Sequence, residues 1–173
     1  MRIVFDLDGT LANPAHRQHF LEKEPRDWDG FFEACDKDAP IDPAIETLIA
    51  LNRATDKNGD QHRIEIWSGR GEGKDRSVRK KTLRWLWDHC RGQITFAEFS
   101  NDHGYFGSRG AYARVRMRPH GDHTPDEILK KAWLDAARAH NKEPHLIFDD
   151  RQKVVDMWRA EGIICFQVAP GNF

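Results

Sequence analysis

The chain has 173 residues, of which 39% are hydrophobic and 32% charged, and its formal net charge is −1. That length supports one domain with a full hydrophobic core, and the near-zero charge excludes a chain-wide attraction to nucleic acid. The apolar runs are too short to cross a bilayer, and no signal peptide is expected because Met1 and Arg2 lead directly into a strand pattern.

The first predicted element is a buried strand over the apolar run Ile3-Val4-Phe5. Asp6-Leu7-Asp8-Gly9-Thr10 follows at once, so that Gly9 ends the strand and a loop begins. Residues i and i+2 of an extended chain point the same way, so the two carboxylates are expected to lie on one side. The carboxyl end of a buried parallel strand is where open α/β sheets bind ligands. An Asp-rich turn without a function is the alternative.

Residues 13–42 contain two short helical patterns, at 17–22 and 27–35, with Asp27 as the N-cap of the second. The segment is too short for an independent domain, so we expect a small helical lid insert beside the site. Within it, Arg17 is either a guanidinium for a phosphate or a nucleic-acid backbone, or an ordinary surface arginine.

Asp42 and Pro43 predict a helix start, as N-cap and first helical residue, and the helix is expected to stop at residues 58–59. The next pattern, residues 63–70, is a strand that ends in Ser68, Gly69 and Arg70. Ser68 and nearby backbone amides are candidates for holding a phosphate oxygen, and Arg70 for clamping the phosphate with two hydrogen bonds. A strand-to-helix turn capped by Ser68 is the alternative.

A basic helix is predicted from Val78 to His89, and a solvated face is the simplest interpretation of its charges. Residues 94–99 predict a strand. Residues 101–118 interleave aromatic residues with arginines, a pattern able to stack bases and neutralise phosphates. We favour a surface loop with a short strand over such a nucleic-acid groove, because loops of this length are as often merely irregular as functional.

The residues from Thr124 onward have the pattern of a capping box and predict a helix to about residue 140. At helical spacing, Lys130 falls on the edge of the apolar stripe, whereas Lys131 falls among polar residues. Lys130 is therefore the better candidate to reach inward, with Asp126 one turn earlier as its partner. The alternative is an exposed ion pair between Asp126 and Lys130.

Another apolar strand, over residues 144–151, ends in the adjacent carboxylates Asp149 and Asp150. Paired acids at a buried strand end are costly without a cation, and oxygen ligands favour Mg²⁺ over zinc. A helix and a last strand at 163–168 follow. The alternation of strands and helices predicts an α/β fold with a doubly wound parallel sheet.

The three cysteines, Cys35, Cys90 and Cys165, are widely spaced and include no Cys-x-x-Cys pair. This usage argues against a disulfide framework or a zinc site and favours thiols buried as small hydrophobic groups. It also predicts a cytoplasmic protein, because that compartment keeps thiols reduced.

Taken in order, three of these strand ends and the helix with Lys130 resemble the four motifs of the haloacid dehalogenase-like phosphatases. The resemblance covers essentially the whole chain. The matching residues are Asp6-x-Asp8-Gly9-Thr10, Ser68, Lys130 and Asp149-Asp150. The resemblance implies a three-layer α/β/α sandwich around a central parallel sheet. It also implies that residues 1–173 form one domain of this type, with the lid insert at about 13–42.

Part of the sequence is similar to the 3′-phosphatase domain of the bacteriophage polynucleotide kinase/phosphatases. The similar residues are Ser68-Gly69-Arg70, Asp126-x-x-x-Lys130, residues 148–159 and residues 167–173. The chain contains no Gly-x-x-x-x-Gly-Lys-Ser/Thr motif, so we expect a stand-alone phosphatase, which leaves room for a separate kinase or ligase partner. Residues 101–118 look longer than their counterpart, and no function carries over to them.

The resemblance also implies roles for individual residues. Asp6 would be the nucleophile that forms an aspartyl-phosphate, and Asp8 would be the general acid and base. Ser68 and Lys130 would hold the phosphate. The expected Mg²⁺ ligands are Asp6, the Asp8 carbonyl and Asp149, with Asp150 in support. The expected substrate-binding residues are Thr10, Arg17, Gly69, Arg70 and Asp126.

The leading hypothesis is a Mg²⁺-dependent phosphomonoesterase that removes 3′-phosphate from DNA or RNA ends. A nucleotide or small-metabolite phosphatase with the same chemistry is one alternative. An inactive module that binds nucleic-acid ends or docks onto a kinase is another. The full set of Asp6, Asp8, Lys130 and Asp149 argues against the inactive module, because binding alone would not need all four.

Overall fold

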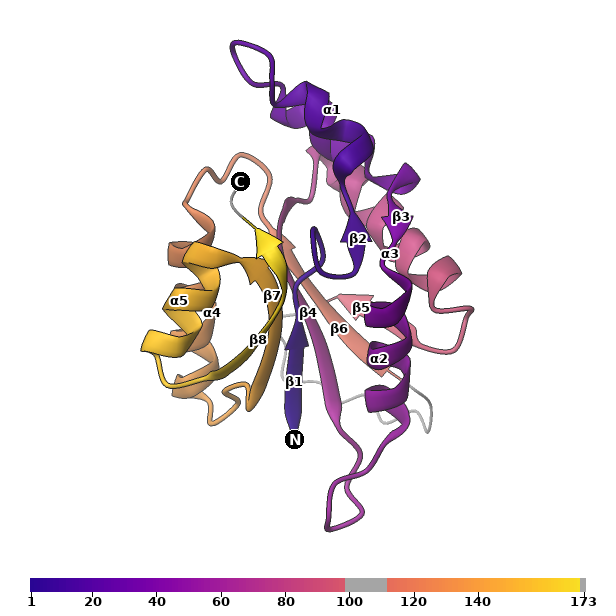
Figure 1. Cartoon of the computed structure of the whole chain (residues 1–173), viewed down its shortest axis with the longest axis vertical. Coiled ribbons are helices and arrows are strands. Elements are labelled where there is room, and N and C mark those ends of the chain that lie inside the picture. Colours follow the sequence, from indigo (N-terminus) through magenta and orange to yellow (C-terminus); the bar gives the residue numbers. More distant parts are fainter. Residues whose placement is uncertain (99–111, 172–173) are drawn as a thin grey trace.

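The computed structural model describes residues 1–98 and 112–171. At its centre lies a six-stranded sheet in the order β5-β6-β4-β1-β7-β8, and all five neighbouring pairs are parallel (Figure 1). The strands are β1 (Arg2–Phe5), β4 (Arg63–Gly71), β5 (Thr95–Glu98), β6 (Tyr112–Arg118), β7 (Leu146–Arg151) and β8 (Ile164–Gly171). From β1 the chain forms β4, β5 and β6 on one side and then β7 and β8 on the other, so the sheet is doubly wound.

Helices cover both faces of this sheet. On one side lie α2 (Asp42–Arg53) and α3 (Ser77–His89), and on the other lie α4 (Asp126–Ala139) and α5 (Gln152–Ala160) (Figure 1). The predicted three-layer α/β/α sandwich is therefore confirmed. Every helix in the described part of the chain is too short or too polar to cross a membrane.

A separate hydrophobic core fills each of the two interfaces between sheet and helices. Phe5 of β1, Leu48 of α2 and Leu86 of α3 belong to one core, and each is fully buried. Val4, the residue before Phe5 in β1, points to the opposite core with Trp158 of α5. The alternation follows from the pleat of the strand, which sends successive side chains to opposite faces. The three cysteines are buried and free, as predicted.

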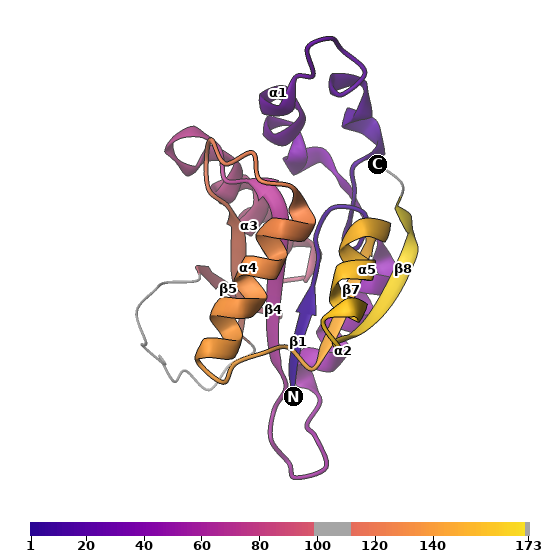
Figure 2. The same ribbon diagram turned by 90° about the vertical axis from the view of Figure 1, so that its left-hand side faces the viewer.

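The segment expected to form a lid rises above the carboxyl ends of the strands, where α1 stands apart from the sheet (Figures 1 and 2). Its ends are held together by a small antiparallel pair, β2 (Ala12–Asn13) with β3 (Ala39–Pro40). Between them lie the 3₁₀ helix η1 (Ala15–Phe20), α1 (Trp28–Glu33) and the 3₁₀ turn η2 (Cys35–Lys37). The Asp27 carboxylate caps α1 by accepting a hydrogen bond from Gly30 N at 2.8 Å, as predicted.

Several element boundaries differ from the sequence-based expectations. The predicted helix at 17–22 is the 3₁₀ helix η1, which begins two residues earlier, and α2 stops at Arg53 rather than near Gly59. The capping box at Thr124 is wrong: α4 begins at Asp126 with Pro125 at the cap position and no side-chain cap. Thr124 instead donates its backbone N–H to the Asp122 carboxylate. Another 3₁₀ turn, η3 (Lys74–Arg76), precedes α3.

The segment at residues 101–118, predicted as a surface loop with a short strand, does contain a strand. The last part of it, β6, pairs with both β4 and β5, so it is an interior strand of the sheet. Ala113, Val115 and Met117 alternate as buried residues along it, which fixes its inward face. The rest of the predicted loop, residues 101–111, lies outside the described residues.

Candidate active site

The site is built around the ends of two adjacent strands, β1 and β7. Asp6 follows β1 directly and its backbone N–H donates to Phe148 O of β7 at 2.8 Å. Asp149 and Asp150 are the fourth and fifth residues of β7. The strand order reverses between β1 and β7, and such a switch point opens a crevice at the carboxyl edge of the sheet. Asp6, Asp149 and Asp150 are all buried there, with one carboxylate oxygen of each within 4.8 Å of the others.

Lys130 reaches this cluster from α4. Its ammonium Nζ lies 2.8 Å from Asp149 Oδ2 and 2.9 Å from Asp6 Oδ1, and the residue is 1% exposed. Burial alone lowers the pKa of a lysine, but Asp149 and Asp6 outweigh it here, so the pKa of Lys130 is raised and the ammonium stays charged. The alternative of an exposed Asp126–Lys130 pair is wrong. Lys131, by contrast, pairs with Asp135 on the outer surface of α4.

The three carboxylates carry more negative charge than Lys130 can balance. Burial raises the pKa of Asp6 well above its usual value against the pull of Lys130, and Asp149 and Asp150 raise it further. Burial and Asp149 likewise raise the pKa of Asp150 to about 6. Asp6 Oδ1 has the Lys130 ammonium beside it at the ion-pair distance of 2.9 Å, but outside hydrogen-bond geometry. An oxygen-only donor set with excess negative charge fits a hard divalent cation such as Mg²⁺.

Trp158 of α5 hydrogen-bonds to one carboxylate of this cluster, that of Asp149. It is fully buried, and its indole Nε1 donates a hydrogen bond to Asp149 Oδ2 at 3.2 Å. The same oxygen accepts from Lys130. A buried carboxylate held by two donors has a fixed orientation, so Trp158 and Lys130 together determine which way Asp149 faces.

Asp8 does not join the carboxylate cluster through its side chain but faces two arginines. Arg17 Nη2 lies 2.5 Å from Asp8 Oδ1, and Arg70 Nε lies 3.1 Å from Asp8 Oδ2, with a second contact from Arg70 Nη2. Burial raises the pKa of Asp8, but Arg70 and Arg17 more than offset this and lower the pKa to about 2. Asp8 is therefore a carboxylate in this arrangement. Arg17 is completely buried, so the surface-arginine alternative is wrong.

Asp38, which the sequence analysis did not single out, holds both arginines. It is 3% exposed and accepts from Arg17 Nε and Nη2, each at 2.7 Å, and from Arg70 Nη2 at 2.8 Å. His16 Nε2 also lies 2.9 Å from it. Two carboxylates thus share two buried guanidiniums, an arrangement that keeps all four groups paired away from water. No local pattern marks Asp38, because its partners lie 21 and 32 residues away.

Gly9 is required where the first strand turns. Its φ angle is +83°, and a Cβ atom at this position would overlap the Asp150 carboxylate. Thr10 is fully buried, and its Oγ1 lies 3.4 Å from Asp150 Oδ1, at the long limit of a hydrogen bond. The tight turn thus brings the first motif against the last one without a side chain between them.

A second close approach joins β4 to α4. A Cβ atom on Gly69 would overlap the Asp126 carboxylate. Asp126 Oδ1 contacts Arg118 Nη2, and its Oδ2 lies 2.6 Å from Arg151 Nη1. Arg118 also donates its Nε–H to Gly69 O at 2.7 Å. Arg118, on β6, thereby ties the end of β4 to the start of α4, a role that the sequence analysis missed.

Ser68 is fully buried, and its Oγ accepts a hydrogen bond from the Arg70 backbone N–H at 3.1 Å. This bond stabilises the turn after β4. This contact agrees with the alternative in which Ser68 caps the turn after the strand. Its role in holding a phosphate stays a prediction.

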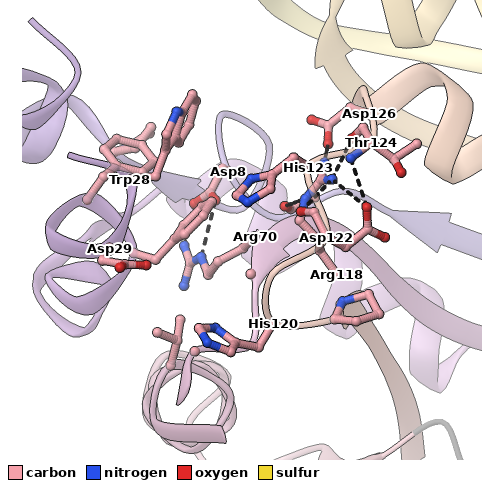
Figure 3. Close-up of a pocket in the computed structure, with 18 of the residues that line it drawn as sticks. Asp8, Trp28, Asp29, Arg70, Arg118, His120, Asp122, His123, Thr124 and Asp126 are labelled. Carbon is pink, nitrogen blue, oxygen red and sulfur yellow. Dashed lines mark hydrogen bonds and ion pairs between the residues drawn. The ribbon is translucent and has the colours of Figure 1, made fainter. Parts of the chain in front are cut away.

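A cavity of about 780 Å³ opens above these groups. Figure 3 shows it between Trp28 and Asp29 of α1 on one side and the segment from Arg118 to Asp126 on the other, with Asp8 and Arg70 between them. The predicted site residues that line it are Asp6, Asp8, Gly69, Arg70, Asp126 and Asp150. The remaining five lie buried behind this lining and are Thr10, Arg17, Ser68, Lys130 and Asp149.

The fold and this acidic strand-end site define a haloacid dehalogenase-like phosphatase domain. The family model described as polynucleotide kinase PNKP phosphatase domain matches residues 1–173. The chain therefore belongs to the family of PNKP phosphatase domains.

Two solved structures share the fold. A chain in the "Structure of the Pnkp1/Rnl/Hen1 RNA repair complex" is 24% identical with a TM-score of 0.69, over 99% of this chain and 43% of that one. A chain in the "Structure of Pnkp1/Rnl/Hen1 complex" is 25% identical with a TM-score of 0.68, over 99% and 47%. This chain thus spans less than half the length of either relative.

Proposed function

We propose that this domain removes 3′-phosphate from the ends of DNA or RNA through an aspartyl-phosphate on Asp6, with Mg²⁺ as cofactor. The observation that carries the proposal is the position of Asp6. Its carboxylate lines an open cavity, next to a second carboxylate, Asp8, that two buried arginines hold in place. A nucleophile and a proton-transfer group side by side are the two parts that stepwise phosphate ester hydrolysis needs.

In the first step, an Asp6 carboxylate oxygen attacks phosphorus, the bond from phosphorus to the 3′ oxygen breaks, and that oxygen takes a proton from Asp8. In the second step, water attacks the same phosphorus, Asp8 takes the proton of the water, and the phosphate leaves with the Asp6 carboxylate restored. In the second step Asp8 accepts a proton, which its ionised form can do. In the first step Asp8 donates a proton and must therefore be protonated. Because Arg17 and Arg70 lower its pKa to about 2, they must shift part of their hydrogen bonding to the incoming phosphate.

Asp6, Asp149 and Asp150 would hold the Mg²⁺ ion, with the Asp8 carbonyl as a further oxygen. When bound, Mg²⁺ supplies the positive charge that lets an anionic nucleophile approach an anionic phosphate. Lys130 already neutralises part of the Asp6 and Asp149 charge at 2.9 and 2.8 Å. We propose that it also contacts a phosphate oxygen once the substrate is bound.

The choice of a polymer end over a small metabolite is supported by the family. A volume of about 780 Å³ leaves room for a nucleotide beyond the phosphate group, and it is also within the range of small-molecule sites. We also propose that the chain is one domain, with residues 13–42 as a lid over this space, since α1 forms one of its walls.

Relatives of the matched fold come from RNA repair complexes, and this chain spans less than half of their length. We propose that the domain acts beside kinase or ligase activities carried by other polypeptide segments. Enzymatic joining of a 3′-phosphorylated RNA end by a kinase and ligase mixture, with and without this protein, tests this. Equal joining in both cases would contradict it.

The function is tested with one oligonucleotide sequence made as DNA and as RNA, each with a 3′- or a 5′-phosphate, beside nucleoside 3′-monophosphates. We expect Mg²⁺-dependent phosphate release from the 3′-phosphorylated oligonucleotides, loss of release with EDTA, and none from the Asp6→Asn variant. Faster release from the mononucleotides would favour the small-molecule alternative. Tight binding of 3′ ends without any release would favour the inactive binding module.

A further inference from the structure

The side of the cavity formed by α1 is aromatic. Trp28, Phe31 and Phe32 line it together, whereas the opposite side presents polar groups of both charges (Figure 3). These are Arg118, His120, Asp122, His123 and Asp126. Two such different walls suit a ligand with one flat apolar part and one polar part.

Trp28 is the most exposed of these aromatic residues, at 40% of its surface. Its ring is nevertheless fixed, because it packs edge-on against Phe31, with the ring centres 6.0 Å apart, and at a tilt against Phe32, with the centres 5.8 Å apart. Phe31 is itself buried, and the Arg17 guanidinium lies 4.0 Å over its ring. The exposed indole is therefore linked through one residue to an arginine that contacts Asp8.

An exposed tryptophan by itself needs no special explanation. Trp87 on α3 illustrates this, since it is 44% exposed and does not line the cavity. Trp28 differs because it is held against two phenylalanines at the mouth of the candidate active site. A pre-ordered aromatic face loses little conformational freedom on binding a flat ring.

We propose that Trp28 is the stacking platform for the base of the 3′-terminal nucleotide, with the sugar facing the polar wall on the opposite side. This inference rests on the proposed function and adds to it the part of the substrate that the cavity recognises. It explains why the cavity extends beyond the phosphate position. It also predicts sequence-tolerant binding, because every base offers a flat ring to stack on.

The test compares two 3′-phosphorylated oligonucleotides that differ only in the last nucleotide, which either carries its base or is abasic. In Trp28→Ala we expect KM for the end with a base to rise roughly 5- to 100-fold while kcat stays near the wild-type value. For the abasic end, wild type and Trp28→Ala should have the same KM. Trp87→Ala, which removes an equally exposed indole outside the cavity, should leave both KM values unchanged.

Two further variants separate stacking from simple packing. Trp28→Phe keeps an aromatic face and should recover most of the affinity, whereas Trp28→Leu keeps apolar bulk alone and should behave like Trp28→Ala. Equal KM values for wild type and Trp28→Ala on the end with a base would overturn the inference, as would an equal rise on the abasic end. Absence of any 3′-end turnover by the wild type would overturn the proposed function as well, so the two failures are distinguishable.

Discussion

The Arg17 guanidinium forks onto the Asp38 carboxylate, with Nε and Nη2 each 2.7 Å from a separate oxygen. Both side chains are essentially inaccessible to solvent. A fork of this kind fixes the plane of the guanidinium as well as its position. The remaining N–H groups of Arg17 are therefore directed at Asp8, at 2.5 Å, and at Phe31 O, at 3.1 Å. Asp38, in the segment that we propose as a lid, thus orients a group of the candidate active site.

Asp38→Asn should impair both activity and stability. It removes one of two carboxylates that pair with Arg17 and Arg70, and breaking a buried ion pair on one side costs about 3–5 kcal/mol of folding free energy. We expect a lower melting temperature and at least about a tenfold lower kcat/KM, since misplaced catalytic groups are costly. Asp36→Asn, an exposed neighbour in the same turn, is the control and should change neither. Wild-type kinetics in Asp38→Asn would contradict the claim that Asp38 orients Arg17 for catalysis.

Lys130→Met and Lys131→Met form a matched pair on one helix. Lys130 contacts Asp6 and Asp149 in the interior, so its replacement leaves two buried carboxylates without their cation. The expected loss is about 3–5 kcal/mol of unfolding free energy, together with phosphatase activity. Lys131 pairs with Asp135 and Glu161 at the solvent-exposed surface, and such pairs contribute little to stability. Denaturant unfolding of both variants measures the difference, and equal midpoints would show that Lys130 is not a buried counter-ion.

Trp158→Phe tests the support of Asp149. The substitution keeps a ring in the core but removes the N–H that donates to Asp149 Oδ2 at 3.2 Å. Losing such a supporting hydrogen bond typically weakens metal binding by about 10- to 100-fold. We therefore expect the Mg²⁺ concentration for half-maximal activity to rise, and calorimetric Mg²⁺ titration to show the same weakening. Trp133→Phe makes the same change in the same aromatic cluster and should leave the Mg²⁺ requirement as it is.

Gly69→Ala should act through Asp126. The added Cβ overlaps the Asp126 carboxylate, which must move away from the β4 end and take its contacts with Arg118 and Arg151 with it. A displacement of about 1 Å can cost about 100-fold in rate. At Gly71 the added Cβ would meet only Phe32, at 3.3 Å, so Gly71→Ala should be much milder. Steady-state kinetics on a 3′-phosphorylated oligonucleotide measure the difference between the two variants. Similar kcat/KM values for both would contradict the claim that Gly69→Ala acts by displacing Asp126.

The sequence predicts the convergence of Asp6, Asp149 and Lys130 for a physical reason. Parallel strands point the same way, so the polar residues that end each apolar run must meet at one edge of the sheet. Helical spacing then distinguishes Lys130 from Lys131, because only one of them adjoins the apolar stripe. Local patterns were sufficient wherever the contact follows from the regular geometry of an element.

The rest depends on contacts that local patterns do not encode. Asp38 lies in a short turn and gains its partners only when the segment before α2 folds back over β4. In β6 a usable signal was present: Ala113, Val115 and Met117 alternate with longer polar or aromatic residues, which is the period of a strand. The sequence analysis predicted only a surface loop with a short strand here, and it missed Arg118 as the link between Gly69 and Asp126.

The central claim is that Asp6 accepts the phosphoryl group from a 3′ end. The most direct measurement mixes the enzyme with excess 3′-phosphorylated oligonucleotide and Mg²⁺, quenches with borohydride to reduce any acyl phosphate, and maps the modified residue by mass spectrometry. We predict reduction of Asp6 to homoserine, dependent on substrate and absent in Asp6→Asn. Phosphate release at full rate with Asp6 unmodified, or with the modification at another residue, would contradict the account.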